Sequence, residues 1–271
     1  QKFTYLNRAK PYVLKNPMTV DHAEVRTNLI HSVLKTASYN AARQNKDLAL
    51  FEISDIDAIG YAGKMLSVVL TGNEKNQEGI AERPYDFYDA KGIFENLMAI
   101  LGITKNRYSV RKWSFSDKEM HPGRSAEVYI GKKLIGFFGE LHPVALKEYG
   151  LKNASVLALD LASAFEVRVG NVKASIPSRF PSVFRDLAFV VDEGIPYEDL
   201  RKEALKSSTL IKNVEVFDVY RGAGVDDGKK SMALSITFSK EDATLKDEEV
   251  NDAFQKVIAS LRAKFKAEIR E

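Results

Sequence analysis

The alternation of apolar and polar positions is clearest in the last third of the chain, residues 179–271. Leu187, Phe189 and Val191 alternate with small residues, which is the period of a strand. The predicted elements are a strand at 187–191, a helix after Pro196, strands at 214–219 and 231–239, a helix at 247–265 and a short strand at 267–270. This order predicts a ferredoxin-like βαββαβ sandwich.

The first 165 residues show the pattern of an α/β domain with antiparallel strands. The predicted elements are a helix at His22–Gln44, strands at 48–56 and 65–71, a helix at 85–101, strands at 108–115 and 127–141, a short helix from His142 to Gly150 and a strand at 156–161. A turn at Gly131-Lys132-Lys133 divides the strand pattern of 127–141 into a hairpin. Periodicity is lost after Ala162, so we predict an α+β chain with domains at 1–165 and 179–271 and a linker at 166–178.

Composition narrows the function. The chain has no cysteine, which excludes disulfides, thiolate metal sites and cysteine nucleophiles. No apolar run approaches the roughly 18 residues of a membrane span, and no signal peptide is visible, so we expect a cytoplasmic protein without a membrane partner. The chain begins with Gln1 rather than Met, so we expect a fragment of a longer protein.

Charge limits the kind of RNA contact that is possible. The net charge is +3, but residues 171–271 hold 17 Lys and Arg against 18 Asp and Glu. A broadly basic nucleic-acid surface is therefore excluded, and any RNA contact must come from a local patch.

The motifs of enzyme active sites are missing from the sequence. The four histidines, His22, His31, His121 and His142, do not fall in a metal-binding spacing, and the simplest interpretation is that each stabilises a turn. Glycine-rich phosphate loops and a serine in a G-x-S-x-G setting are also missing. We therefore expect no catalytic residues and no metal or cofactor ligands in this chain.

One group of residues suits RNA. It contains aromatic side chains next to arginines, and such pairs can stack on unpaired bases and contact phosphates. The candidate tRNA-binding residues are Arg179, Phe180, Arg185, Asp186, Tyr220 and Arg221. From the pattern alone, the alternative is that Phe180 and Phe184 fill a domain interface and that Arg185 and Asp186 form a local ion pair.

Nearly the whole chain resembles the C-terminal part of the beta subunit of bacterial phenylalanine–tRNA ligase. Each matching segment is short, but their order along the chain is specific. The segments are Asn16 to Thr19, Val25 to Ile30, Tyr39-Asn40-x-x-Arg43, Leu50 to Ile53, Phe87 to Gly92, His121 to Ala126, Gly139 to Pro143, Phe180-Pro181-x-x-x-Arg185-Asp186 and Thr244 to Val250.

The resemblance implies an inactive, class II synthetase-like first domain and a ferredoxin-fold domain that binds the anticodon stem-loop of the phenylalanine tRNA. It also implies a heterotetramer of two alpha and two beta chains, in which ATP and Mg²⁺ serve the whole ligase and not this fragment. The surface near Val25 to Leu34 should then contact the alpha subunit, and its exposure should make the fragment self-associate.

Within the resemblance, we interpret Phe180 or Tyr220 as a base-stacking residue, the arginines as contacts to phosphate or base edges, and Asp186 as the residue that orients Arg185. A second hypothesis is a pure scaffold that holds the alpha subunit and has no tRNA recognition of its own. The near-neutral charge of residues 171–271 favours the scaffold. A third is a free-standing enzyme on the ferredoxin-like fold, against which the missing nucleophile and base argue.

Overall fold

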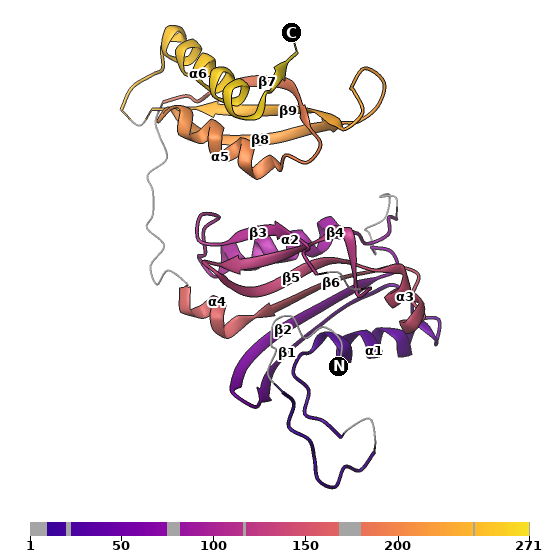
Figure 1. Ribbon diagram of the computed structural model, residues 1–271. Coiled ribbons are helices and arrows are strands. Elements are labelled where there is room, and N and C mark those ends of the chain that lie inside the picture. Colours follow the sequence, from indigo (N-terminus) through magenta and orange to yellow (C-terminus); the bar gives the residue numbers. More distant parts are fainter. Residues whose placement is uncertain are drawn as a thin grey trace. The chain divides into compact units, whose positions relative to one another are not determined.

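The computed structural model describes residues 10–19, 23–74, 82–115, 118–167, 180–240 and 242–270. It divides into two compact units, Gln1–Lys173 and Ala174–Glu271 (Figure 1). Each unit has its own antiparallel sheet, helices and apolar core, which confirms the α+β class predicted from the sequence. Among the described residues, no helix is both long and apolar enough to cross a membrane.

A six-stranded antiparallel sheet forms the centre of the first unit, with the strand order β1-β2-β6-β5-β4-β3 (Figure 1). The strands are β1 (Leu48–Ala58), β2 (Tyr61–Thr71), β3 (Ser109–Lys112), β4 (Met120–Ile130), β5 (Lys133–Leu141) and β6 (Ala154–Asp160). The β4–β5 hairpin turns at Gly131, whose φ of +58° suits glycine, as the turn signal predicted. The central strand β6 is buried along its whole length.

Helices cover both faces of this sheet. Phe137 and Phe138 are consecutive on β5 and therefore enter opposite faces. Phe137 packs in the cluster that holds α1 (Ile30–Ala41) and α3 (Pro143–Tyr149). Phe138 packs in the cluster that holds α2 (Phe87–Ile100) and α4 (Leu161–Val167).

The first helix begins later than the sequence pattern predicted. We expected a helix from His22, which lies outside the described residues, but α1 begins at Ile30. The backbone N–H of Leu14 donates to Ala23, and that of Val25 donates to Tyr12. These groups are occupied by an antiparallel bridge between Val13 and Glu24, so this segment cannot take part in helical hydrogen bonds.

The helix α4 lies where we expected the chain to lose regular structure. The Asp160 carboxylate accepts hydrogen bonds from the Ser163 backbone N–H at 3.0 Å and from its hydroxyl at 2.6 Å, which stabilises the first turn. Residues 166 and 167, the first two of the predicted linker, are therefore helical, whereas residues 168–178 lie outside the described residues.

The second unit has the predicted βαββαβ order. Its elements are β7 (Val183–Asp192), α5 (Tyr197–Ser207), β8 (Ile211–Tyr220), β9 (Lys229–Phe238), α6 (Asp247–Phe265) and β10 (Glu268–Ile269). The antiparallel sheet has the order β10-β7-β9-β8. Alternate residues of the strands, such as Leu187, Phe189 and Leu234, pack with the apolar stripes of α5 and α6 in one core.

Candidate nucleic-acid interface

The face of the second sheet opposite this core forms a platform of mostly small and polar residues. The strand register arranges its residues in four rows across β10, β7, β9 and β8. Row one is Glu268, Val190, Ser231 and Tyr220; row two is Arg270, Ala188, Ala233 and Asp218; row three is Asp186, Ser235 and Glu215; row four is Phe184, Thr237 and Asn213. We call these residues the open face.

Small side chains on the two central strands form the lowest part of the open face, which we call its floor. β9 contributes Ser231, Ala233 and Ser235, and β7 contributes Ala188 between them. Side chains this small allow a flat ring to lie close to the backbone. Tyr220, which is 44% exposed, stands at one side of this floor and can stack on such a ring.

The charges on the open face suit base edges better than phosphates. The carboxylates of Asp186, Glu215 and Asp218 lie in rows two and three with the guanidinium of Arg270, whereas the Glu268 carboxylate of row one is bound to the Lys229 ammonium at 2.6 Å. Carboxylates repel phosphate but accept hydrogen bonds from the amino groups of bases. The open face can therefore read unpaired bases without binding much of the RNA backbone.

The β8–β9 loop borders the first two rows. The Arg221 guanidinium donates to both carboxylate oxygens of Glu193, at 2.8 to 3.1 Å, and this bond holds the pKa of Glu193 below its usual range. The Arg270 guanidinium donates to the Gly224 carbonyl in the same loop. A cavity of about 450 Å³ is lined by the loop and by the Glu193–Arg221 pair.

The structure does not bring the predicted site residues together. Arg179 lies outside the described residues, and Phe180 is half-buried just before β7. Asp186 and Tyr220 both lie on the open face but in different rows, three and one. The Arg221 guanidinium is bound to the Glu193 carboxylate at 2.8 Å.

The hypothesis that Asp186 orients Arg185 is wrong. Arg185 is opposite Ile236 on the core side of β7, whereas Asp186 is opposite Ser235 on the open face. Consecutive strand residues project to opposite faces, so the two side chains diverge. The Arg185 guanidinium instead donates to the Phe184 carbonyl at 3.2 Å.

Sequence reasoning missed four residues of the open face that could contact RNA: Phe184, Asp218, Ser231 and Arg270. The alternation within each strand could have placed each residue on one face or the other. It could not show that Asp218 and Arg270 share a row, because this depends on register between strands that are far apart in sequence.

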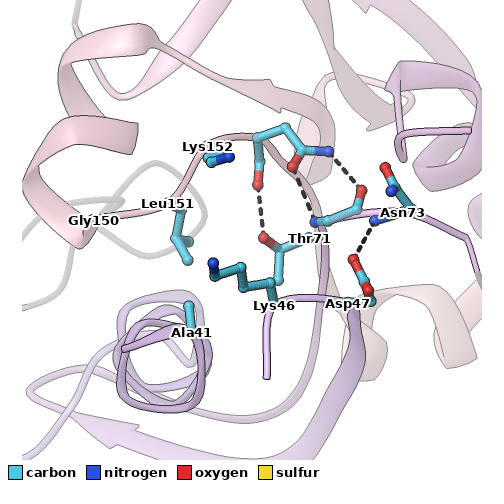
Figure 2. Close-up of a pocket in the computed structure, with 10 residues that line it drawn as sticks. Ala41, Lys46, Asp47, Thr71, Asn73, Gly150, Leu151 and Lys152 are labelled. Atoms are coloured by element: carbon cyan, nitrogen blue, oxygen red, sulfur yellow. Dashed lines mark hydrogen bonds between the residues drawn. The ribbon is translucent and has the colours of Figure 1, made fainter. Parts of the chain in front are cut away.

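The first unit contains a pocket of about 310 Å³ between the ends of α1, α3 and β2, shown in Figure 2. The Asn153 side chain accepts from the Gly72 N–H at 3.0 Å and donates to the Gly72 carbonyl at 2.8 Å. The Asp47 carboxylate accepts from the Asn73 N–H at 2.8 Å. These bonds hold the turn after β2, so the polar groups of the pocket have a structural use.

The described residues of both units hold no group of three or more His, Cys, Asp or Glu side chains that could bind a metal ion. The buried carboxylate Glu127 accepts from the Ser114 N–H at 2.7 Å, the Ser114 hydroxyl at 2.6 Å and the Tyr129 hydroxyl at 2.8 Å. It therefore joins β4 to the segment after β3.

The expected interface near Val25 to Leu34 is wrong. Leu29, Ile30 and Leu34 are fully buried inside the first unit, because this segment and α1 supply its core. The edge strand β1 instead exposes Phe51 (70%) and Ile53 (51%) on one face. Exposed large apolar side chains on an edge strand are typical of a surface that binds a partner.

Comparison with known proteins agrees with the two-unit architecture. Residues 1–161 match the family described as "Phenylalanyl tRNA synthetase beta chain CLM domain". Residues 178–270 match the family described as "Ferredoxin-fold anticodon binding domain".

Over nearly its whole length, the chain is similar to phenylalanine–tRNA ligase beta subunits. The chain is 38% identical over 281 residues to the phenylalanine–tRNA ligase beta subunit of Latilactobacillus sakei, covering 99% of this chain and 34% of that protein. It is 38% identical to that of Syntrophus aciditrophicus (97% of this chain, 34% of that protein). It is 37% identical to that of Geobacillus kaustophilus (98% and 34%). The chain thus spans about a third of the length of these relatives.

Proposed function

Because this chain belongs to the family of phenylalanine–tRNA ligase beta subunits, we propose that it binds the anticodon stem-loop of the phenylalanine tRNA through the open face. The observation that carries the proposal is the low floor of small residues on β7 and β9, bordered by Tyr220, Asp218 and Arg270. No catalytic step is assigned to this chain.

Each bordering residue has a defined role in this proposal. Tyr220 stacks on an anticodon base, which is worth roughly 1–3 kcal/mol. Asp218 accepts a hydrogen bond from the amino group of a base, and Arg270 donates to a base edge or a phosphate. Ser231, a largely buried residue in the row of Tyr220, adds a hydroxyl as a further donor or acceptor at the floor. Arg179, Phe180, Arg185, Asp186 and Arg221 remain predictions as tRNA contacts.

We propose that the first unit binds the alpha subunit of the same ligase through β1. An edge strand has unpaired backbone groups, and Phe51 and Ile53 add exposed apolar surface beside them. Both features suit a protein partner that pairs with the edge and covers the two side chains. In the assembled cytoplasmic ligase, two alpha and two beta chains would cooperate, and ATP and Mg²⁺ would serve phenylalanine activation outside this chain.

The second candidate function is a scaffold that only holds the alpha subunit. The two carboxylates of row three, Asp186 and Glu215, favour it, because carboxylates oppose a polyanion. The two functions differ in whether binding depends on the anticodon.

The test is binding of the chain to the phenylalanine tRNA and to the same tRNA with a changed anticodon, at two salt concentrations. We expect tighter binding of the native anticodon. We also expect a shallow salt dependence, because the open face offers few cations to phosphates and each phosphate contact to single-stranded RNA adds about 0.7 to the log–log slope. Asp218→Asn should reduce the preference for the native anticodon by about 1–3 kcal/mol. The control is Asp252→Asn, which removes an exposed carboxylate from α6. Equal and weak binding to both tRNAs would support the scaffold instead.

A further inference from the structure

The fourth row of the open face differs chemically from the other three. It contains Phe184, Thr237 and Asn213, and none of these is charged. The net negative charge of the open face is concentrated in row three, because Asp218 shares row two with Arg270 and the Glu268 carboxylate of row one is bound to the Lys229 ammonium at 2.6 Å. Row four is the uncharged end of the open face, next to row three.

Phe184 is the exposed aromatic residue of this row. Its side chain is 62% exposed at the start of β7, beside the hydroxyl of Thr237. The Asn213 amide donates to the Glu215 carboxylate at 2.8 Å, which orients that amide on the open face. An aromatic ring next to a hydroxyl and an oriented amide has the parts of a base-stacking site.

The row of Phe184 is too far from the row of Tyr220 for both rings to contact one base. Thr237 and Ser231 mark the two rows on β9, and six residues of strand span about 20 Å. Stacked nucleotides advance about 3.4 Å each, so two rings this far apart contact different nucleotides.

We propose that Phe184 forms a second base-stacking subsite, which takes an unpaired nucleobase of the tRNA other than the base that stacks on Tyr220. The proposal rests on the proposed function of the open face as the RNA surface and extends it by one nucleotide site. The RNA chain runs across the face between the base that stacks on Tyr220 and the base that stacks on Phe184.

The experiment measures binding of the whole chain to an anticodon stem-loop RNA by fluorescence anisotropy. The variants are Phe184→Ala, Phe184→Leu, Phe184→Tyr and Tyr220→Ala. The matched control is Phe217→Ala, because Phe217 is equally exposed (61%) on the same sheet but is the unpaired residue of a β8 bulge, outside the four rows. Circular dichroism verifies that each variant folds, which the exposure of both phenylalanines favours.

We expect Phe184→Ala to weaken binding roughly 5- to 150-fold, as the loss of one stacked base predicts. Phe184→Tyr should retain most of the affinity, Phe184→Leu should not, and Phe217→Ala should change it less than twofold. A set of stem-loops, each with one base removed, then locates the contact. Phe184→Ala should have no effect on the probe that lacks the base stacked on Phe184. That base should be at a different position from the one whose removal abolishes the effect of Tyr220→Ala.

Two results would overturn the subsite. In the first, Phe184→Ala binds like the unmodified chain while Tyr220→Ala binds weakly, which would leave the proposed function intact. In the second, Phe184→Ala weakens every probe equally, which would show an apolar contact without a stacked base. If neither Phe184→Ala nor Tyr220→Ala has an effect, the proposed function of the open face fails together with the subsite.

Discussion

The ion pair between Arg221 and Glu193 gives a sharp prediction, because we first interpreted Arg221 as an RNA contact. Its guanidinium donates three hydrogen bonds to the two carboxylate oxygens, at 2.8 to 3.1 Å. The side chains are 58% and 45% exposed, so solvent screens the pair. Exposed pairs are worth about 0.2–1 kcal/mol, and bidentate geometry places this one in the upper half of that range.

Arg221→Ala should therefore lower the free energy of unfolding of the second unit by about 0.5–1 kcal/mol at pH 7, which is roughly 2–8 °C in Tm. Glu193→Gln should have a similar effect, and Lys256→Ala on the exposed side of α6 should have almost none. Arg221 holds the pKa of Glu193 below its usual range. The stabilisation is therefore present above pH 4.5 and is lost as the pH falls through the lowered pKa.

The assay is thermal unfolding at pH 7 and at pH 3, with stem-loop binding at several salt concentrations. At pH 3 the difference in Tm between the unmodified chain and Arg221→Ala should shrink. A different pattern would refute this reasoning: an unchanged Tm at pH 7, together with a salt slope lower by about 0.7. That pattern would mean that Arg221 binds an RNA phosphate and contributes little to stability through Glu193.

Other predictions concern the first unit. Phe137→Ala should lower the free energy of unfolding by about 3–5 kcal/mol in urea titrations, because the ring is 1% exposed between α1 and Trp113; a loss below 1 kcal/mol would contradict this packing. Burial raises the pKa of Tyr149 to about 12. The neutral hydroxyl therefore stabilises the fold fully below pH 10, and this stabilisation is lost as the pH rises towards 12. In Tyr149→Phe the decline in Tm over this range should be smaller, and an equal decline would argue against the buried hydroxyl. Phe51→Asp with Ile53→Asp should abolish concentration-dependent association in sedimentation experiments without lowering Tm, whereas association that persists would exclude this face of β1 as the interface.

The second unit shows how far periodicity can predict a fold. The strand at 231–239, the helix after Pro196 and the acidic start of the last helix appear at the expected places, and the strand predicted at 187–191 lies within β7, which begins four residues earlier at Val183. Their local signals agree with the packing that they finally adopt. In the first unit, α1 begins eight residues after the expected start, and residues 23–25 instead pair with 12–14 across a bridge between Val13 and Glu24. No local signal in residues 22–29 shows that bridge.

The candidate site was less predictable than the fold. Tyr220 was identified because an aromatic residue next to an arginine is a local pattern. Asp218 and Arg270 were missed because each is ordinary in its own segment, and only the register of β8, β9, β7 and β10 places them in one row. Arg221 was interpreted as free for RNA because Glu193, its partner, is 28 residues away.

The sequence by itself determined the order of the elements in the second unit, the side of each strand that faces the core, and the lack of a basic surface. These properties depend on neighbours within a few residues, or on composition. The tertiary structure decided which residues share the open face, that Leu29, Ile30 and Leu34 are core instead of interface, and that Arg185 and Asp186 diverge. These properties depend on contacts between distant segments, and sheet register brings such segments together only when the whole chain has packed.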